Sequence, residues 1–177
     1  GEMILPGKKV ILQKIIQNVR STKLQVQPCG IDLTLKRILT WKSAGQVDFD
    51  NSRRSNAATE VLPFQADTSG SGEDPSVSNF VDLTQGSYLV EFNETVDVPL
   101  DVMGQIFVRS SLFRSGALVQ AGVMDSGYKG AVGCMLQVVN PHGLKLWKDA
   151  RLAQMVFHQM SEPTEGYSGT YQGRQAM

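Results

Sequence analysis

The chain has 177 residues, which is enough for one domain with a sizeable hydrophobic core. Its 17 basic residues balance 17 acidic ones, so the formal net charge is zero and nothing suggests a surface for nucleic acid or membrane. No apolar run approaches the roughly 20 residues that a membrane-spanning helix needs. We therefore expect a cytoplasmic protein with no nucleic-acid or membrane partner.

The N-terminal part predicts one helix followed by one strand. Residues 8–20 predict the long helix of the chain, because four apolar side chains recur on one helical face: Leu12, Ile15, Ile16 and Val19. Residues 23–38 alternate at period two from Leu24 onward, which predicts a strand that is interrupted at residues 28–30 (PCG).

Residues 43–79 are rich in Ser, Asn, Asp and Gly and predict a long surface loop, with a short strand near residues 61–64. Loops of this length are usually functional or disordered. The two cysteines, Cys29 and Cys134, lie outside this loop and far apart, without CxxC or HxE spacing. We expect free thiols rather than a zinc site.

The second half of the chain predicts short strands separated by turns, at residues 87–94, 104–110, 131–139 and 152–160. Regular short strands with turn signals indicate an all-β barrel or sandwich. The tail at 162–177 has glycines, hydroxyl groups and two tyrosines but no apolar periodicity, so we expect a mobile segment that orders on a ligand. We interpret residues 1–177 as a single domain.

Residues 104–116 (GQIFVRSSLFRSG) combine two arginines and three serines at a strand end, before a glycine turn. The planar guanidinium group suits phosphate oxygens, and serine hydroxyls with backbone N–H groups complete an anion-binding site. A solvated turn with a structural salt bridge explains this cluster equally well.

Four further stretches join this cluster in sequence order: PCGIDL at 28–33, AGVMDSGYKG at 121–130, ARLAQMVF at 150–157 and YSGTYQGR at 167–174. Together the five resemble the motifs of the dUTP diphosphatase and dCTP deaminase superfamily. The resemblance implies a distorted jelly-roll-like β-barrel with a short N-terminal helix, assembled as a homotrimer whose active sites are shared between subunits.

The two branches of that superfamily differ in chemistry. The N-terminal MIL, the VQPCGIDL wording, RSSLFRSG and YQGRQ resemble the deaminases. Deamination needs a glutamate on the strand after the hairpin, but Gln137 follows Leu136 there, and a gapless count gives Met135 instead. Because an amide cannot take and return a proton near neutral pH, we favour dUTP hydrolysis. The alternatives are a dCTP deaminase, a bifunctional enzyme, or a nucleotide-binding regulatory protein without turnover.

The resemblance assigns the reaction centre to the hairpin at 121–130. Asp125 would be the general base that activates water for attack on the α-phosphorus of dUTP, and Tyr128, an aromatic ring that we expect to be exposed, would pack beneath the deoxyribose. Ala121 and Gly122 would hold the pyrimidine through main-chain hydrogen bonds, while Gln120 replaces the threonine usual in deaminases. Without the resemblance, Asp125 would be read as a turn aspartate bonded to its own backbone.

The remaining assignments concern the phosphates, the metal and the tail. Asp32 would contact Mg²⁺ through water, although a purely structural role is the other interpretation. Tyr171 would stack on uracil, and Arg174 would replace the phosphate-binding arginine that the tail lacks at its usual place. Arg151 is interpreted as structural. The residues assigned to the phosphates or their support are Arg109, Ser110, Ser111, Arg114 and Gln154.

Overall fold

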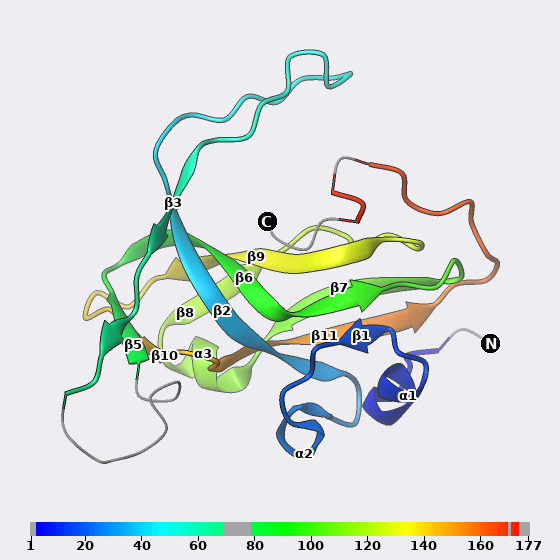
Figure 1. The fold of residues 1–177 in the computed structure, drawn as a ribbon, viewed down its shortest axis with the longest axis horizontal. Coiled ribbons are helices and arrows are strands. Elements are labelled where there is room, and N and C mark those ends of the chain that lie inside the picture. Colours follow the sequence, from blue (N-terminus) through cyan, green and yellow to red (C-terminus); the bar gives the residue numbers. More distant parts are fainter. Residues whose placement is uncertain (1–2, 69–78, 170, 174–177) are drawn as a thin grey trace.

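The computed structural model describes residues 3–68, 79–169 and 171–173, and Figure 1 shows that strands dominate them. The N-terminal elements are α1 (Gly7–Leu12), β1 (Ile16–Gln17), α2 (Thr22–Gln25), β2 (Ile31–Trp41), β3 (Thr59–Leu62) and β4 (Gln65–Ala66). The remaining elements are β5 (Asn79–Leu83), β6 (Gly86–Asp97), β7 (Val102–Val108), α3 (Ser110–Arg114), β8 (Ala117–Gln120), β9 (Lys129–Val138), β10 (Leu144–Trp147) and β11 (Arg151–Gln159). No helix among these described elements is long and apolar enough to cross a membrane.

The strands form one large antiparallel sheet with the order β7-β11-β2-β6-β9-β8, to which β1 and β3 add short pairings. A second sheet has the order β10-β5-β4. The large sheet curls so that its two edges approach each other: the hairpin after β8 bonds back to β7 through Gly104 and Met124. The predicted all-β barrel and its four predicted strands, which correspond to β6, β7, β9 and β11, are confirmed.

The core lies inside the curled sheet. Along β9, every second side chain points inward and is buried, from Val132 through Cys134 and Leu136 to Val138. Phe92 of β6 and Phe157 of β11 are the largest fully buried side chains in this core. Strict alternation of this kind leaves the other face of each strand free to carry polar or ligand-binding groups.

The N-terminal helix is shorter than the sequence predicts. It ends at Leu12, and Lys14 and Asn18 adopt left-handed backbone conformations with φ of 57° and 65°. The chain after Leu12 therefore turns into β1, in which Ile16 pairs with Val96 of β6. Burial of Ile15 and Ile16 against the barrel outweighs the helical periodicity, and Leu12 is left exposed.

The predicted strand at 23–38 begins later than expected. Leu24 lies in the short helix α2 and is exposed, and its N–H is capped by the Ser21 hydroxyl. The strand starts at Ile31, after a turn in which the Gln27 N–H donates to the Gly30 carbonyl. A side chain at Gly30 would collide with the Met155 carbonyl, so this turn requires glycine beside β11.

The predicted loop at 43–79 contains more ordered backbone than expected. Residues 43–58, which we call the arm, project from the barrel (Figure 1) and are closed by two backbone hydrogen bonds between Gln46 and Ser55. The strand predicted near 61–64 is present as β3 and β4, which flank Pro63 and pair with β2 and β5. Residues 69–78 lie outside the described residues.

Three short elements were not predicted from the sequence. The expected glycine turn after the RSS motif is the one-turn helix α3, followed by Gly116 at φ 81°. The other two are strands β8 and β10, which have four residues each. Cys29 and Cys134 are free thiols as predicted, and burial raises the pKa of Cys134 to about 12.

A buried glutamate joins the N-terminal segment to the barrel. Glu94 of β6 accepts hydrogen bonds from the Thr34 N–H at 2.7 Å, the Thr34 hydroxyl at 2.5 Å and the Gln25 amide at 3.0 Å. The same Gln25 amide donates to the Asp32 carbonyl at 2.9 Å. Because Glu94 is fully buried, desolvation raises its pKa despite these donors. The network therefore holds α2 against β2 next to Asp32.

The raised pKa predicts a pH-dependent contribution of Glu94 to stability. As pH falls toward the ordinary glutamate value of 4.5, the folded protein takes up this proton before the unfolded chain does. As the pH is lowered from about 7 to about 5, the unfolding free energy of the parent should therefore rise relative to that of Glu94→Gln. Urea unfolding of both proteins across this range measures the difference, and a difference that stays constant with pH would contradict the assignment.

Candidate active site

A pocket of about 260 Å³ opens where β7, the hairpin after β8 and the C-terminal segment meet. Its lining is mostly apolar or glycine, and Asp125 is the one carboxylate among the described residues that line it. The lining residues are Gly104, Ile106, Ala121, Gly122, Val123, Met124, Asp125, Tyr128, Ala131, Gly133, Tyr167 and Tyr171. The pocket thus combines one acid, three tyrosines and a largely apolar wall.

The hairpin that carries Asp125 is held at both ends by backbone hydrogen bonds. Gly104 and Met124 exchange both of their N–H···O bonds, at 2.9 and 3.1 Å. At the other end, the Gly127 N–H donates to the Val98 carbonyl at 3.0 Å. Between these ties the Asp125 side chain is exposed to solvent, in a position where it can contact a bound ligand and water.

Tyr128 is buried rather than exposed, which corrects the expectation from the sequence. Only 8% of its surface is accessible, and its hydroxyl donates to the Ala131 carbonyl at 2.6 Å. The ring therefore forms a fixed floor of the pocket. Its fixed position suits a residue that limits what can fit against the hairpin.

The C-terminal segment packs against the same hairpin. The Tyr167 ring meets the Tyr128 ring edge-on, with 5.4 Å between centroids. The Gln172 amide donates to the Gly127 carbonyl at 2.9 Å and accepts from the Lys129 N–H at 2.8 Å. Tyr171, which the sequence predicts to contact the ligand, lines the pocket. Tyr167 and Gln172 were missed, because isolated polar residues in a glycine-rich tail carry no periodic signal.

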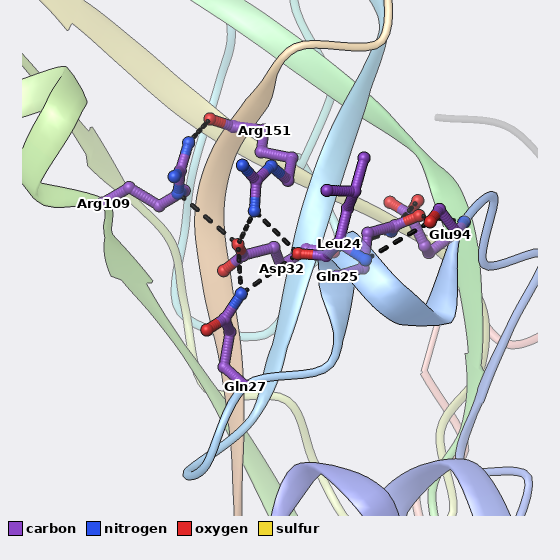
Figure 2. Close-up of polar contacts among 8 residues, drawn as sticks. Leu24, Gln25, Gln27, Asp32, Glu94, Arg109 and Arg151 are labelled. Carbon is purple, nitrogen blue, oxygen red and sulfur yellow. Dashed lines mark hydrogen bonds and ion pairs between the residues drawn. The ribbon is translucent and has the colours of Figure 1, made fainter.

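A second group of candidate residues lies around Asp32. Figure 2 shows the carboxylate of Asp32 facing Gln27, Arg109 and Arg151, a group that we call the Asp32 cluster. Its Oδ2 accepts from the Arg151 guanidinium and the Gln27 amide, both at 3.1 Å, and lies 3.5 Å from the Arg109 Nε. The two arginines are also fixed by backbone oxygens: Arg109 donates to the Arg151 carbonyl and Arg151 to the Leu24 carbonyl.

The Asp32 cluster carries one negative and two positive charges. Asp32 is 2% exposed, and burial raises its pKa although both arginines and Gln27 act in the opposite direction. The two guanidinium groups retain partial solvent exposure, at 24% and 31%. A buried carboxylate that positions two half-exposed arginines leaves a net positive site, which is suited to an anion such as phosphate.

The other residues assigned to phosphate lie around this cluster. Gln154 of β11 pairs with Asp32 of β2 and with Phe107 of β7, so these side chains share one face of the sheet. Ser110, Ser111 and Arg114 belong to α3 and are exposed. Gln120 is exposed at the end of β8 and is absent from the residues that line the pocket. Arg174 lies outside the described residues.

The pocket and the Asp32 cluster face opposite sides of β7. Gly104 and Ile106 line the pocket, whereas Phe107 shares the face of Gln154 and Asp32, and Arg109 reaches Asp32 from just beyond the strand end. Ile106 and Arg109 are also about 10 Å apart along the strand, from a rise of roughly 3.3 Å per residue. One chain therefore presents the pocket and the Asp32 cluster on opposite faces of β7, and we call these the two half-sites.

Strand β9, which follows the hairpin, supplies further side chains on the side of Asp125. Ala131 and Gly133 of β9 line the pocket, and Met135 and Gln137 follow on the same outward face. Met135 pairs with Gln120, and Gln137 is exposed beside Leu118. This face of β9 carries no carboxylate from Ala131 to Gln137, all of which the structure describes.

Three comparisons with known proteins identify proteins that this chain is similar to. A family profile described as dCTP deaminase-like matches residues 7–160. The probable deoxyuridine 5'-triphosphate nucleotidohydrolase of Methanosarcina mazei is 42% identical over 159 residues, which cover 89% of this chain and 86% of that protein. The deoxyuridine 5'-triphosphate nucleotidohydrolase of Methanocaldococcus jannaschii is 35% identical over 150 residues, or 85% and 88% of the two chains.

Among solved structures, the 2'-deoxycytidine 5'-triphosphate deaminase of Agrobacterium tumefaciens superposes with a TM-score of 0.60 at 16% identity. The superposition covers 89% of this chain but 49% of that one, so this chain spans about half of its length. At this identity, the likeness shows a shared fold.

The hairpin gives a test of how closely the tail is packed on it. Gly127 has φ of 78°, and an added Cβ would lie 2.7 Å from the Gly166 Cα. Gly127→Ala should therefore lower the unfolding free energy by about 2 kcal/mol, from left-handed strain and displacement of the tail. Gly122→Ala in the same hairpin is the control, because nothing lies within 4 Å of its added Cβ. Equal urea midpoints for the two variants would contradict this packing.

Proposed function

The chain belongs to the dCTP deaminase-like family, and from that premise we propose that it is a dUTP diphosphatase, which hydrolyses dUTP to dUMP and pyrophosphate. The names of its relatives support this reaction over deamination. The observation that carries the proposal is the charge pattern of the pocket. Asp125 is the one acid among the described lining residues, and the adjoining face of β9 offers no second carboxylate.

Asp125 acts as the general base in this proposal. Its exposed carboxylate accepts a proton from a water molecule, whose oxygen attacks the α-phosphorus of dUTP. The bond from the α-phosphorus to the oxygen bridging to the β-phosphorus breaks, and pyrophosphate leaves with that oxygen. The hairpin hydrogen bonds at Gly104 and Gly127 hold the backbone around Asp125, so positioning does not depend on the ligand.

The rest of the pocket selects the nucleoside. The exposed backbone of Ala121 and Gly122 offers main-chain donors and acceptors to the edge of uracil. In this proposal the deoxyribose packs against the buried ring of Tyr128, whose hydroxyl is fixed by its bond to Ala131, so that little space is left for a 2'-hydroxyl. Tyr171 supplies an aromatic face at the pocket, as stacking on the base requires.

The triphosphate needs positive charge that the pocket itself lacks. Arg109, with Ser110, Ser111, Arg114 and Gln154 around it, supplies donors on the opposite face of β7. We infer that these groups reach the phosphates of a nucleotide held by a neighbouring subunit, which the predicted homotrimer provides. The two half-sites on opposite faces of one strand support this arrangement.

The residues present do not form a magnesium site. The Asp32 Oδ2 is surrounded by three N–H donors, and two guanidinium groups oppose the approach of a dication. Among residues 3–68, 79–169 and 171–173, there is no cluster of three or more His, Cys, Asp or Glu side chains suited to a metal. Mg²⁺ dependence remains a prediction, in which phosphate oxygens and water hold the ion.

A dCTP deaminase or a bifunctional enzyme is the second candidate, favoured by the deaminase-like family profile and fold. Attack of water on C4 of cytosine requires a group that takes up and returns protons beside the base. Met135 and Gln137, the two residues that stand where the glutamate is expected, cannot do so.

Product analysis separates these candidates. We expect the purified protein with Mg²⁺ to convert dUTP to dUMP and pyrophosphate and to release no ammonia from dCTP. Asp125→Asn should lower the rate at least about 1000-fold, because the amide keeps the shape of the side chain and loses the base. Binding of a non-hydrolysable dUTP analogue by this variant should stay close to that of the parent.

Three results would contradict the proposal. Uridine nucleotide formed from dCTP would establish deamination, and tight dUTP binding by the parent without pyrophosphate release would indicate a regulatory protein. Hydrolysis of dUTP by Asp125→Asn at the parent rate would remove the general base from the mechanism.

Asp32→Asn tests whether Asp32 positions the two arginines or contacts a metal ion. Loss of its charge releases Arg109 and Arg151 from the carboxylate that positions them, but it also removes the desolvation cost that raises the pKa of Asp32, so the unfolding free energy should change by less than about 2 kcal/mol. The activity should fall because the arginines lose their fixed positions, and a magnesium titration should not restore it. Recovery of the parent rate at high Mg²⁺ would instead support the metal contact that the sequence predicted.

A further inference from the structure

The arm contacts Tyr171 of the C-terminal segment. The Arg54 Nη2 donates to the Tyr171 hydroxyl at 2.8 Å and to the Asn56 Oδ1 at 3.1 Å. The Tyr171 hydroxyl in turn donates to the Asn56 Oδ1 at 3.3 Å. The guanidinium carbon also lies 5.6 Å from the centroid of the Tyr171 ring, within the range of a cation–π contact.

Arg54 is placed for this contact by the arm itself. The Gln46 amide donates to the Arg53 carbonyl at 2.7 Å, and the Arg53 N–H donates to the Asp48 carboxylate at 2.7 Å. Together with the backbone pairing of Gln46 and Ser55, these bonds fix the backbone on both sides of Arg54. Arg54 is half-buried, whereas both neighbours in sequence are exposed.

Tyr171 connects this contact to the hairpin that bears Asp125. The Tyr171 N–H donates to the Tyr167 hydroxyl at 3.2 Å, and the Tyr167 ring packs edge-on against Tyr128. Both tail tyrosines line the pocket. Arg54 is therefore the outer end of a continuous series of contacts that passes through the tail to the floor of the pocket.

We propose that Arg54 is a positioning residue that holds the C-terminal segment over the pocket by binding Tyr171, and that this is the role of the arm. We call this contact between Arg54 and Tyr171 the clasp. The inference rests on the proposed function for its kinetic consequence, but the clasp itself exists without a ligand. A tail that is already held need not be ordered when the nucleotide binds, so the clasp raises the fraction of protein that is ready to bind.

The first test measures the clasp without any nucleotide. Three amide groups report the tail: Tyr167 donates to the Ser126 carbonyl, Tyr171 to the Tyr167 hydroxyl and Gly173 to the Lys129 carbonyl. In Arg54→Ala, hydrogen exchange at Tyr171 and Gly173 should be about 10-fold faster, as expected for loss of one charge-assisted hydrogen bond. Exchange at Leu136 in the core should not change.

Variants of both partners separate the clasp from a general effect of charge. Tyr171→Phe keeps the ring and loses the hydroxyl, so it should accelerate exchange at Gly173 less than Arg54→Ala does. Arg54→Lys keeps the charge but is shorter and lacks the planar guanidinium group near the Tyr171 ring, so it should give an intermediate rate. Arg53→Ala removes a neighbouring charge from the arm and should match the parent.

The second test is kinetic. With dUTP, Arg54→Ala should raise KM about 5-fold and leave the pH dependence of kcat unchanged, since Arg54 does not touch the reacting atoms. Combining Arg54→Ala with Tyr171→Phe should be no worse than Arg54→Ala alone, because both remove the same contact.

The outcomes distinguish the clasp from the function. Parent-like exchange at Tyr171 and Gly173 in Arg54→Ala, or additive effects of the two substitutions on KM, would overturn the clasp even if the parent hydrolyses dUTP. Faster tail exchange in Arg54→Ala together with a parent that hydrolyses no dUTP would support the clasp and overturn the proposed function.

Discussion

The alternation of side chains along β7 is the constraint on which the active site depends. Successive residues of a strand point to opposite faces, so Ile106 lines the pocket while Phe107 joins the face of Gln154 and Asp32. Arg109, just after the strand, is held on that second face by the Asp32 carboxylate. A chain that uses both faces of one strand in this way separates its acid from its arginines. In the proposed function, a neighbouring copy of the chain reunites them.

That separation has an electrostatic advantage. If the arginines lay beside Asp125 in the free chain, they would pair with it and occupy the base. Here the buried Asp32 occupies the two guanidinium groups, and the Glu94 network holds the strand segment on which Asp32 lies. Asp125 stands apart in a wall of glycine and apolar residues, which leaves its carboxylate available to a water molecule. The protein thus holds Asp125 and the arginines in separate places, and in the proposed mechanism the substrate joins them.

The tail and the arm extend the pocket beyond the barrel. Both lie outside the conventional strand pattern, and polar contacts help to fix each of them: Gln172 against the hairpin and Arg54 against Tyr171. Contacts of this kind cost little to open, as closing segments around a nucleotide require. The buried ring of Tyr128 is the rigid surface against which the tail packs.

The sequence by itself determined the family, the all-β architecture and four strands, and it singled out Ala121, Gly122, Asp125 and Tyr128, which the structure brings to one pocket. These features are local: they follow from alternation within a strand and from motifs of a few adjacent residues. It could not determine that the first helix ends at Leu12, because burial of Ile15 and Ile16 on β6 competes with helical periodicity. Nor could it pair Arg54 with Tyr171, or enclose Asp32 between two arginines. Those contacts join residues more than 70 positions apart, and only the closing of the barrel brings them together.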